Sequence, residues 1–288
     1  MACLLLKDMR ENGPHFIVIG AQRSGTTWLH RVMTQHDQLW LTPVKELHYF
    51  DKQELRLGVM SAYERNRARF WSPRRLMLDP RWYCRYWFLP RSDEWYGKLF
   101  RRARQKGKIT GEITPAYAVL PEKEWDHLYS LFPDVRLVFI MRDPIIRTWS
   151  ALRNNMKKGR LNSASSVDEL VAQASGFSMA SRSDYLRTIK TVESRFGADR
   201  VHCCFFEQLL SDPTELADSL FQFLGAKPMG EALNIPPAVN SAAGGDAPPF
   251  ALQQALAEQY LPMVDELAER FGEVPLSWAN RYRNLLGV

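Results

Sequence analysis

The residues best suited to chemistry form one short loop, Gly20-Ala-Gln-Arg-Ser-Gly-Thr-Thr27, near the start of the 288-residue chain. Arg23 supplies a positive charge, and Thr26 and Thr27 supply hydroxyl groups. A loop bracketed by glycines turns successive backbone N–H groups inward and aims the start of the next helix at the same point. The loop therefore predicts a binding site for a phosphate or sulfate group.

The spacing is close to the nucleotide-triphosphate loop Gly-x-x-x-x-Gly-Lys-Ser/Thr, but Thr26 occupies the lysine position. The ammonium clamp on β- and γ-phosphates is therefore missing, which disfavours a nucleotide kinase or NTPase. We expect the loop N–H groups and the hydroxyls of Thr26 and Thr27 to hold a single 5′-phosphate. Arg23 then reaches the bond beyond that phosphate. The alternative is a glycine turn in an ordinary α/β domain.

Arg142 and Ser150 form a second candidate pair. Arg142 follows a buried apolar run, so it lies at the carboxyl end of a predicted strand, where open α/β sheets bind ligands. Ser150 lies two turns into the following helix, so both residues flank one anion only if the chain folds back. Asp143 is an alternative magnesium ligand, but the neighbouring Arg142 and the missing lysine disfavour that interpretation.

The segment Lys45-Glu-Leu-His-Tyr-Phe-Asp51 follows a short predicted strand that we place next to the loop. In an extended chain Glu46 and His48 share one face and Lys45 points away. A carboxylate at a strand end near a reacting hydroxyl is a candidate general base. Alternatively, Glu46 pairs with an arginine and His48 is a satisfied core side chain.

These residues need a parallel sheet to bring them together. Strands are predicted at 16–19, 39–41, 108–113, 136–141 and 201–206, with helices at 125–132, 144–158, 183–196, 213–224 and 251–271 between and after them. We predict a loop at 162–178 and another at 239–249. Alternating strands and helices indicate a single α/β domain of the P-loop type, spanning 14–288, with a mainly parallel central sheet flanked by helices.

Positive charge is concentrated in residues 52–107. Between Lys52 and Lys106 the sequence has 15 Lys and Arg against 5 Asp and Glu, whereas the net charge of the whole chain is +6. This stretch is also rich in aromatic residues and is predicted to be a helical insertion that contributes to the acceptor site. The excess charge suggests an anionic partner, although a solvated helical face is the alternative. The aromatic residues are clumped, so nucleic acid is not expected.

Composition places the chain among soluble globular proteins, with 45% hydrophobic and 24% charged residues. No run is long enough to span a bilayer, and the apolar tip at 2–6 is too short for a signal-peptide core. The four cysteines have neither metal-ligand nor disulfide-framework spacing. We therefore expect a cytoplasmic protein, with peripheral membrane contact and oligomeric state left open.

Taken in order, the loop, Lys45-Glu-x-His-x-Phe-Asp51, Gly111-Glu-Ile-Thr-Pro-Ala-Tyr117 and Arg142-Asp-Pro-x-x-Arg-x-x-Ser150 resemble the P-loop sulfotransferases. The resemblance extends from Phe16 to the final helix. It is strongest to bacterial members and to the heparan-sulfate type. These enzymes transfer a sulfuryl group from 3′-phosphoadenosine 5′-phosphosulfate (PAPS) to a hydroxyl or amine and release 3′-phosphoadenosine 5′-phosphate (PAP). No metal is implied.

The resemblance implies a role for each matching residue. The 5′-phosphosulfate would be held by Arg23, Ser24, Gly25, Thr26 and Thr27, and the 3′-phosphate by Arg142 and Ser150. Arg23 would also act in catalysis, Glu46 would be the base and His48 its helper. One departure matters: heparan-type members have Lys where this chain has Ile113, which weakens the case for a heparan-like acceptor.

The sequence does not identify the acceptor. A glycan, a lipid headgroup or a small metabolite, carrying a hydroxyl or an amine, is compatible with the motifs. A non-catalytic protein that only binds PAPS or PAP is the rival function, and it would need no base. Glu46 favours an enzyme over such a binding protein.

Overall fold

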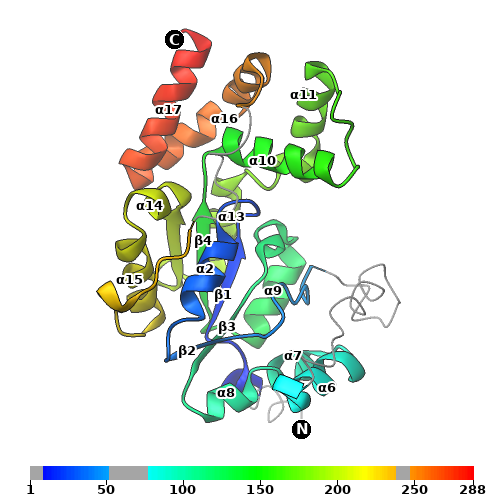
Figure 1. Cartoon of the computed structure of the whole chain (residues 1–288), viewed down its shortest axis with the longest axis vertical. Coiled ribbons are helices and arrows are strands. Elements are labelled where there is room, and N and C mark those ends of the chain that lie inside the picture. Colours follow the sequence, from blue (N-terminus) through cyan, green and yellow to red (C-terminus); the bar gives the residue numbers. More distant parts are fainter. Residues whose placement is uncertain (1–8, 52–76, 238–246) are drawn as a thin grey trace.

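The structure is a computed structural model of the chain, and it describes residues 9–51, 77–237 and 247–288 (Figure 1). The apolar tip at 2–6, the first half of the predicted basic insertion and most of the predicted 239–249 loop lie outside these residues. The described part is an α/β unit in which helices cover a central sheet.

All five strands of the sheet are parallel, and their order is β2-β3-β1-β4-β5. The strands are β1 (Phe16–Gly20), β2 (Leu39–Leu41), β3 (Ile109–Ile113), β4 (Arg136–Met141) and β5 (Val201–Phe205). Side chains of β1 alternate between two cores: Ile17 packs in one cluster and Val18 in the other. Burial on both faces confirms the predicted parallel α/β sheet.

Helices follow nearly every strand. They are α2 (Thr26–Met33), α6 (Pro80–Phe88), α7 (Asp93–Lys98), α8 (Arg101–Gln105), α9 (Glu122–Leu131), α10 (Pro144–Lys157), α11 (Val167–Ser175), α12 (Phe177–Ala180), α13 (Tyr185–Phe196), α14 (Phe206–Ser211), α15 (Pro213–Leu224), α16 (Phe250–Phe271) and α17 (Glu273–Leu286). Short 3₁₀ turns are η2 (Pro115–Val119), η3 (Ala198–Arg200) and η4 (Gly230–Ala232). The predicted helices are confirmed within a few residues at their ends.

The prediction of a loop at 162–178 is wrong, because this region contains α11 and α12. Ser166 caps α11: its hydroxyl accepts from the Glu169 N–H, and the Glu169 carboxylate accepts from the Ser166 N–H. Leu170 and Ala174 are buried and belong to the larger core. The many small polar residues hid a short helix that has only two strongly buried positions.

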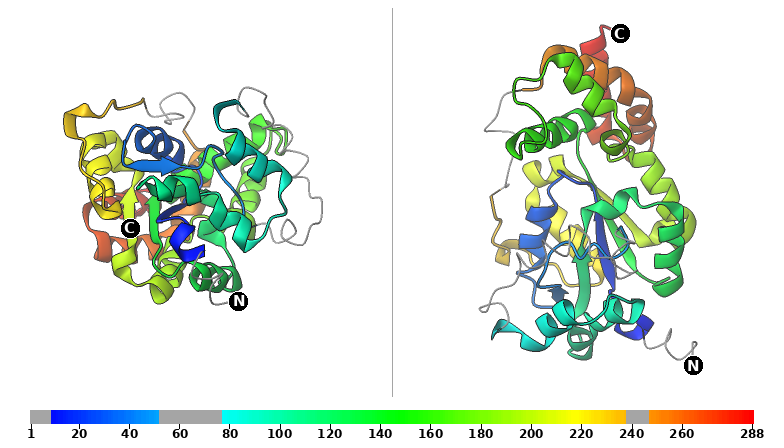
Figure 2. Two further views of the ribbon diagram at one scale, coloured as in Figure 1. Left: turned by 90° about the horizontal axis from the view of Figure 1, so that it is seen from below. Right: turned by 90° about the vertical axis from the view of Figure 1, so that its right-hand side faces the viewer.

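The two ends of the sheet are covered by different helices. In Figures 1 and 2, α10, α11, α16 and α17 gather at one end of the molecule, and α6, α7 and α8 lie at the other. Because α8 leads directly into the start of β3, the second group lies at the amino-terminal ends of the strands. The carboxyl ends, where ligands of such sheets bind, point toward α10.

Candidate active site

The loop between β1 and α2 has the geometry that the sequence predicts for an anion site. Gly25 precedes α2 with φ 93°, and a Cβ there would lie 2.9 Å from the Phe206 ring, so only glycine fits. Arg23 also has a positive φ, 72°. The loop therefore follows the end of a buried strand and leads into the amino terminus of α2, where backbone N–H groups lack helical partners.

A cavity of about 240 Å³ opens beside this loop. Its walls come from the loop, α2, the segment after β2, the end of β4, and α10, and include Gln22, Arg23, Gly25, Thr26, Thr27, Lys45, Glu46, Pro115, Arg142, Ser150, Asn154, Lys158 and Phe206. We call it the anion pocket. The predicted fold-back is present, because Arg142 and Ser150 both line it. Asn154 and Lys158, one and two turns beyond Ser150 on the same helix face, were missed, although their four-residue spacing was readable.

The side chains of Arg23 and Arg142 are both held by backbone carbonyl groups. The Arg23 guanidinium donates to the Ser150 carbonyl at 3.1 Å, and the Arg142 guanidinium donates to the Arg23 carbonyl at 3.2 Å. Arg142 also lies over the Phe206 ring, 4.2 Å from its centroid. Burial lowers the pKa of both arginines, and for Arg23 the charges of Arg147 and Arg153 lower it further. Cations crowded and desolvated in this way favour an anionic ligand.

Lys45 points toward the loop, and the prediction that it points away is wrong. Its ammonium lies 3.2 Å from the Thr27 hydroxyl and 3.5 Å from that of Thr26. The reason is backbone conformation: Glu46 and His48 have φ of 64° and 52°, so the segment is not the extended strand on which the prediction relied. Lys45 thus brings an ammonium group to the hydroxyls of a loop that lacks its own lysine.

The segment 45–51 reaches the loop although β2, the strand before it, is not adjacent to β1. β3 lies between β2 and β1, so the predicted adjacency of the short strand to the loop is wrong. The chain instead crosses the end of β3, and the Glu46 N–H donates to the Ile113 carbonyl at 3.0 Å. Ile113 is buried, and it places no cation where the heparan type has one.

Glu46 and His48 do lie together. His48 Nε2 is 3.4 Å from one Glu46 carboxylate oxygen, and His48 Nδ1 is 2.8 Å from Asp51. Burial alone would lower the pKa of His48, but Asp51 and Glu46 outweigh it and raise the pKa to about 9. Burial would raise the pKa of Glu46, but His48 and Lys45 hold it below its usual value. At neutral pH the pair is therefore an imidazolium beside a carboxylate, and only the carboxylate can accept a proton.

This pairing predicts a pH-dependent stability. The folded protein binds the His48 proton more tightly than the unfolded chain, whose histidines titrate near pH 6.5. The stabilisation is complete below pH 6.5 and is lost as the pH rises through about 9, by up to about 3 kcal/mol. Urea unfolding at several pH values should show this loss in the native chain and a flatter profile in His48→Gln. Parallel profiles would show that His48 is not held as a cation.

A buried carboxyl group stabilises the segment 45–51 through a chain of hydrogen bonds. Glu112 on β3 is fully buried and accepts from the Thr114 hydroxyl at 2.6 Å and the Tyr117 hydroxyl at 3.2 Å. The Tyr117 oxygen in turn accepts the Tyr49 N–H at 2.9 Å. The motif Gly111–Tyr117, to which the sequence assigned no individual roles, therefore fixes the backbone just after Glu46 and His48.

Asp143 has a structural role. Its carboxylate caps α10 by accepting from the Ile146 N–H at 3.1 Å, accepts from the Tyr282 hydroxyl at 3.0 Å, and pairs with Arg281. These contacts tie α17 to the start of α10 and engage both carboxylate oxygens of Asp143. Across residues 9–51, 77–237 and 247–288 no group of three or more His, Cys, Asp or Glu is arranged to hold a metal ion.

Two polar atoms of the loop have no hydrogen-bond partner within the described ranges: Arg23 Nε and the Ser24 hydroxyl, both buried. Buried polar groups are normally satisfied, so these two atoms are suited to hydrogen-bond a bound anion. Loop hydroxyls, the cationic side chains of Arg23, Lys45, Arg142 and Lys158, and the carboxylate of Glu46 therefore line one pocket that suits an anion.

The comparisons assign the family. Residues 14–229 match the sulfotransferase family, and the chain belongs to it. The structure superposes on a sulfotransferase from Alicyclobacillus acidocaldarius with a TM-score of 0.65 and 21% identity, covering 92% of this chain and 98% of that one. The membrane-associated sulfotransferase kil1 of Dictyostelium discoideum is 26% identical over 139 residues, which are 48% of this chain but only 22% of that protein. Among the described helices, none is long and apolar enough to cross a membrane.

Proposed function

We propose that the protein transfers a sulfuryl group from PAPS to a hydroxyl or amine of an acceptor. The observation that carries the proposal is the convergence of Arg23, Lys45 and Arg142 on one pocket with Glu46 in its wall. The donor supplies an activated sulfuryl group on its 5′-phosphate. The unpartnered Arg23 and Ser24 atoms fit the phosphosulfate end of such a donor, and Arg142 and Ser150 fit its 3′-phosphate.

The residues around the pocket then have separate tasks. Glu46 takes the proton of the acceptor as its oxygen or nitrogen bonds to sulfur and the bond from sulfur to the phosphate oxygen breaks. Arg23, Lys45 and the N–H groups of the loop stabilise the negative charge that grows on that phosphate oxygen. His48, as a cation fixed by Asp51, orients Glu46 and does not itself accept the proton.

The domain assignment remains part of this proposal. The catalytic unit is proposed to comprise 14–288, since α17 contacts the start of α10 through Asp143. The acceptor role of 52–107 is also a proposal, and residues 52–76 of this stretch lie outside the described residues. No residue of the described half, 77–107, lines the anion pocket. Cytoplasmic location likewise stays a proposal.

The donor assignment predicts a ligand preference. PAP should bind at least about tenfold more tightly than AMP or ATP without magnesium, a difference of roughly 1.4 kcal/mol or more, because only PAP satisfies both ends of the pocket. Titration calorimetry measures this directly. If ATP with magnesium is the tighter ligand, the chain is a nucleotide-triphosphate enzyme and the proposal is wrong. PAP binding without turnover of any phenol or sugar acceptor would favour the non-catalytic alternative.

A further inference from the structure

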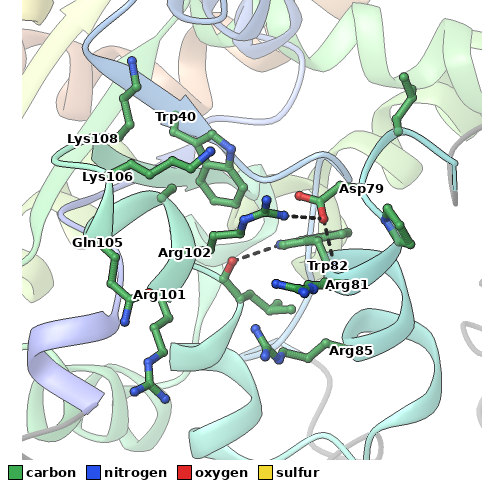
Figure 3. Close-up of a pocket in the computed structure, with 14 residues that line it drawn as sticks. Trp40, Asp79, Arg81, Trp82, Arg85, Arg101, Arg102, Gln105, Lys106 and Lys108 are labelled. Atoms are coloured by element: carbon green, nitrogen blue, oxygen red, sulfur yellow. Dashed lines mark hydrogen bonds and ion pairs between the residues drawn. The ribbon is translucent and has the colours of Figure 1, made fainter.

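A second, larger cavity of about 830 Å³ lies at the opposite end of the sheet, near the amino-terminal ends of β2 and β3 (Figure 3). Six cationic side chains line it: Arg81, Arg85, Arg101, Arg102, Lys106 and Lys108. Asp79 supplies the one carboxylate that the described residues place in its wall. We call this cavity the basic groove.

The cations come from two walls. Figure 3 shows Arg81 and Arg85 on α6, and Arg101, Arg102 and Lys106 on α8 and the residue after it. A neighbouring cavity of about 590 Å³ shares Arg101 and Lys108 with the groove. The positive surface therefore continues from one cavity into the next.

Most of this charge has no internal counterion. Of the six cations, only Arg102 forms an ion pair within the described residues, at 3.3 Å from Asp79. The Arg85 guanidinium donates to the Lys98 carbonyl at 2.7 Å, which satisfies a donor and leaves its charge uncompensated. Like charges lining a concave surface repel one another and focus a positive potential that attracts anions. The site thus favours a ligand with several negative charges.

Two features narrow the class of ligand. The walls are concave, so the flat surface of a lipid bilayer does not reach the cations inside. Trp82 in the wall of the groove, and Tyr86 and Trp95 on α6 and α7, are at least 96% buried, so these three rings are not available to stack on the bases of a single-stranded nucleic acid. The groove presents guanidinium and ammonium donors, and the guanidinium forks match carboxylates and tetrahedral oxyanions.

We propose that the basic groove binds an anionic carbohydrate chain that carries sulfate or carboxylate groups, and so anchors a polymeric acceptor away from the reacting end. The inference rests on the proposed function and names its acceptor class. The groove and the anion pocket lie at opposite ends of strands of five residues, about 17 Å long. Only an oligomer occupies both sites. Sulfate groups added in earlier turnovers would strengthen the anchoring.

The test compares binding of a dextran sulfate oligomer with unsulfated dextran of the same length. The triple variant Arg81→Ala, Arg101→Ala, Lys106→Ala removes three groove cations that have no ion-pair partner among the described residues. We expect the native chain to bind only the sulfated oligomer, with affinity falling about tenfold or more between about 50 and 200 mM salt. The triple variant should bind it at least about tenfold more weakly at low salt and with a shallower salt dependence.

The matched control removes three exposed cations elsewhere, by Arg31→Ala, Lys123→Ala and Lys227→Ala. Equal binding by the native chain and the groove variant, or equal loss in the control, overturns the proposal. Tighter, groove-dependent binding of phosphatidylserine vesicles or single-stranded DNA also overturns it and assigns another partner. PAP affinity and turnover of a small acceptor should be unchanged in the groove variant. If the native chain fails to bind PAP, the proposed function fails whether or not the oligomer binds.

Discussion

Replacing Glu46 by Gln is expected to lower kcat by about 10²–10⁴-fold, the usual contribution of a general base. The amide keeps the size of the carboxylate but cannot take up the acceptor proton. Donor affinity should change by less than about tenfold, because the loop and Arg142 are untouched. Single-turnover assays with labelled donor, together with PAP calorimetry on the same variant, separate the two quantities.

Two further variants make this test specific. Glu258→Gln removes an exposed carboxylate on α16 and should leave kcat unchanged. His48→Ala removes the partner that orients Glu46, so it should lower kcat less than Glu46→Gln does. If His48→Ala abolishes turnover while Glu46→Gln keeps near-normal kcat, the base is His48. If both variants lose activity only through weaker donor binding, the segment 45–51 has a structural role and the base lies elsewhere.

The fold was largely predictable because buried parallel strands have a simple signature. The runs Phe16–Gly20 and Leu137–Met141 are continuously apolar, and only a sheet covered on both faces buries every residue of such a run. The helix α11 was not predictable in the same way. Its stability comes from a capping box and from contacts of Leu170 and Ala174 with the larger core, which local composition does not reveal.

The site was predictable where one local motif defines it, and less so where segments converge. The loop and the Arg142–Ser150 pair follow from strand–loop–helix order, and both line the anion pocket. The direction of Lys45 depends on the positive φ of Glu46 and His48. Glycine and asparagine are the residues that usually indicate such a conformation, and neither occupies these positions. The support of Tyr49 by Tyr117 joins residues 68 positions apart, so no local pattern predicts it.

Arg142→Ala is expected to weaken PAP binding by about 2–4 kcal/mol, because it leaves a 3′-phosphate in the pocket without its charged partner. The fold should survive, since Arg142 follows the end of β4 and its side chain packs on the Phe206 ring and donates to the Arg23 carbonyl. Thermal unfolding checks the fold, and calorimetry measures the affinity. Arg142→Lys keeps the charge without the guanidinium fork, so its affinity for PAP should lie between that of the native chain and that of Arg142→Ala.

The contact with the Arg23 carbonyl provides the decisive comparison for this variant. Losing that 3.2 Å hydrogen bond can loosen the loop and weaken every nucleotide, whereas losing the 3′-phosphate partner weakens PAP alone. AMP, which lacks the 3′-phosphate, separates the two effects. We expect its affinity to change by less than about threefold, well under 1 kcal/mol. If AMP and PAP weaken by the same factor, Arg142 supports the loop and does not read the 3′-phosphate.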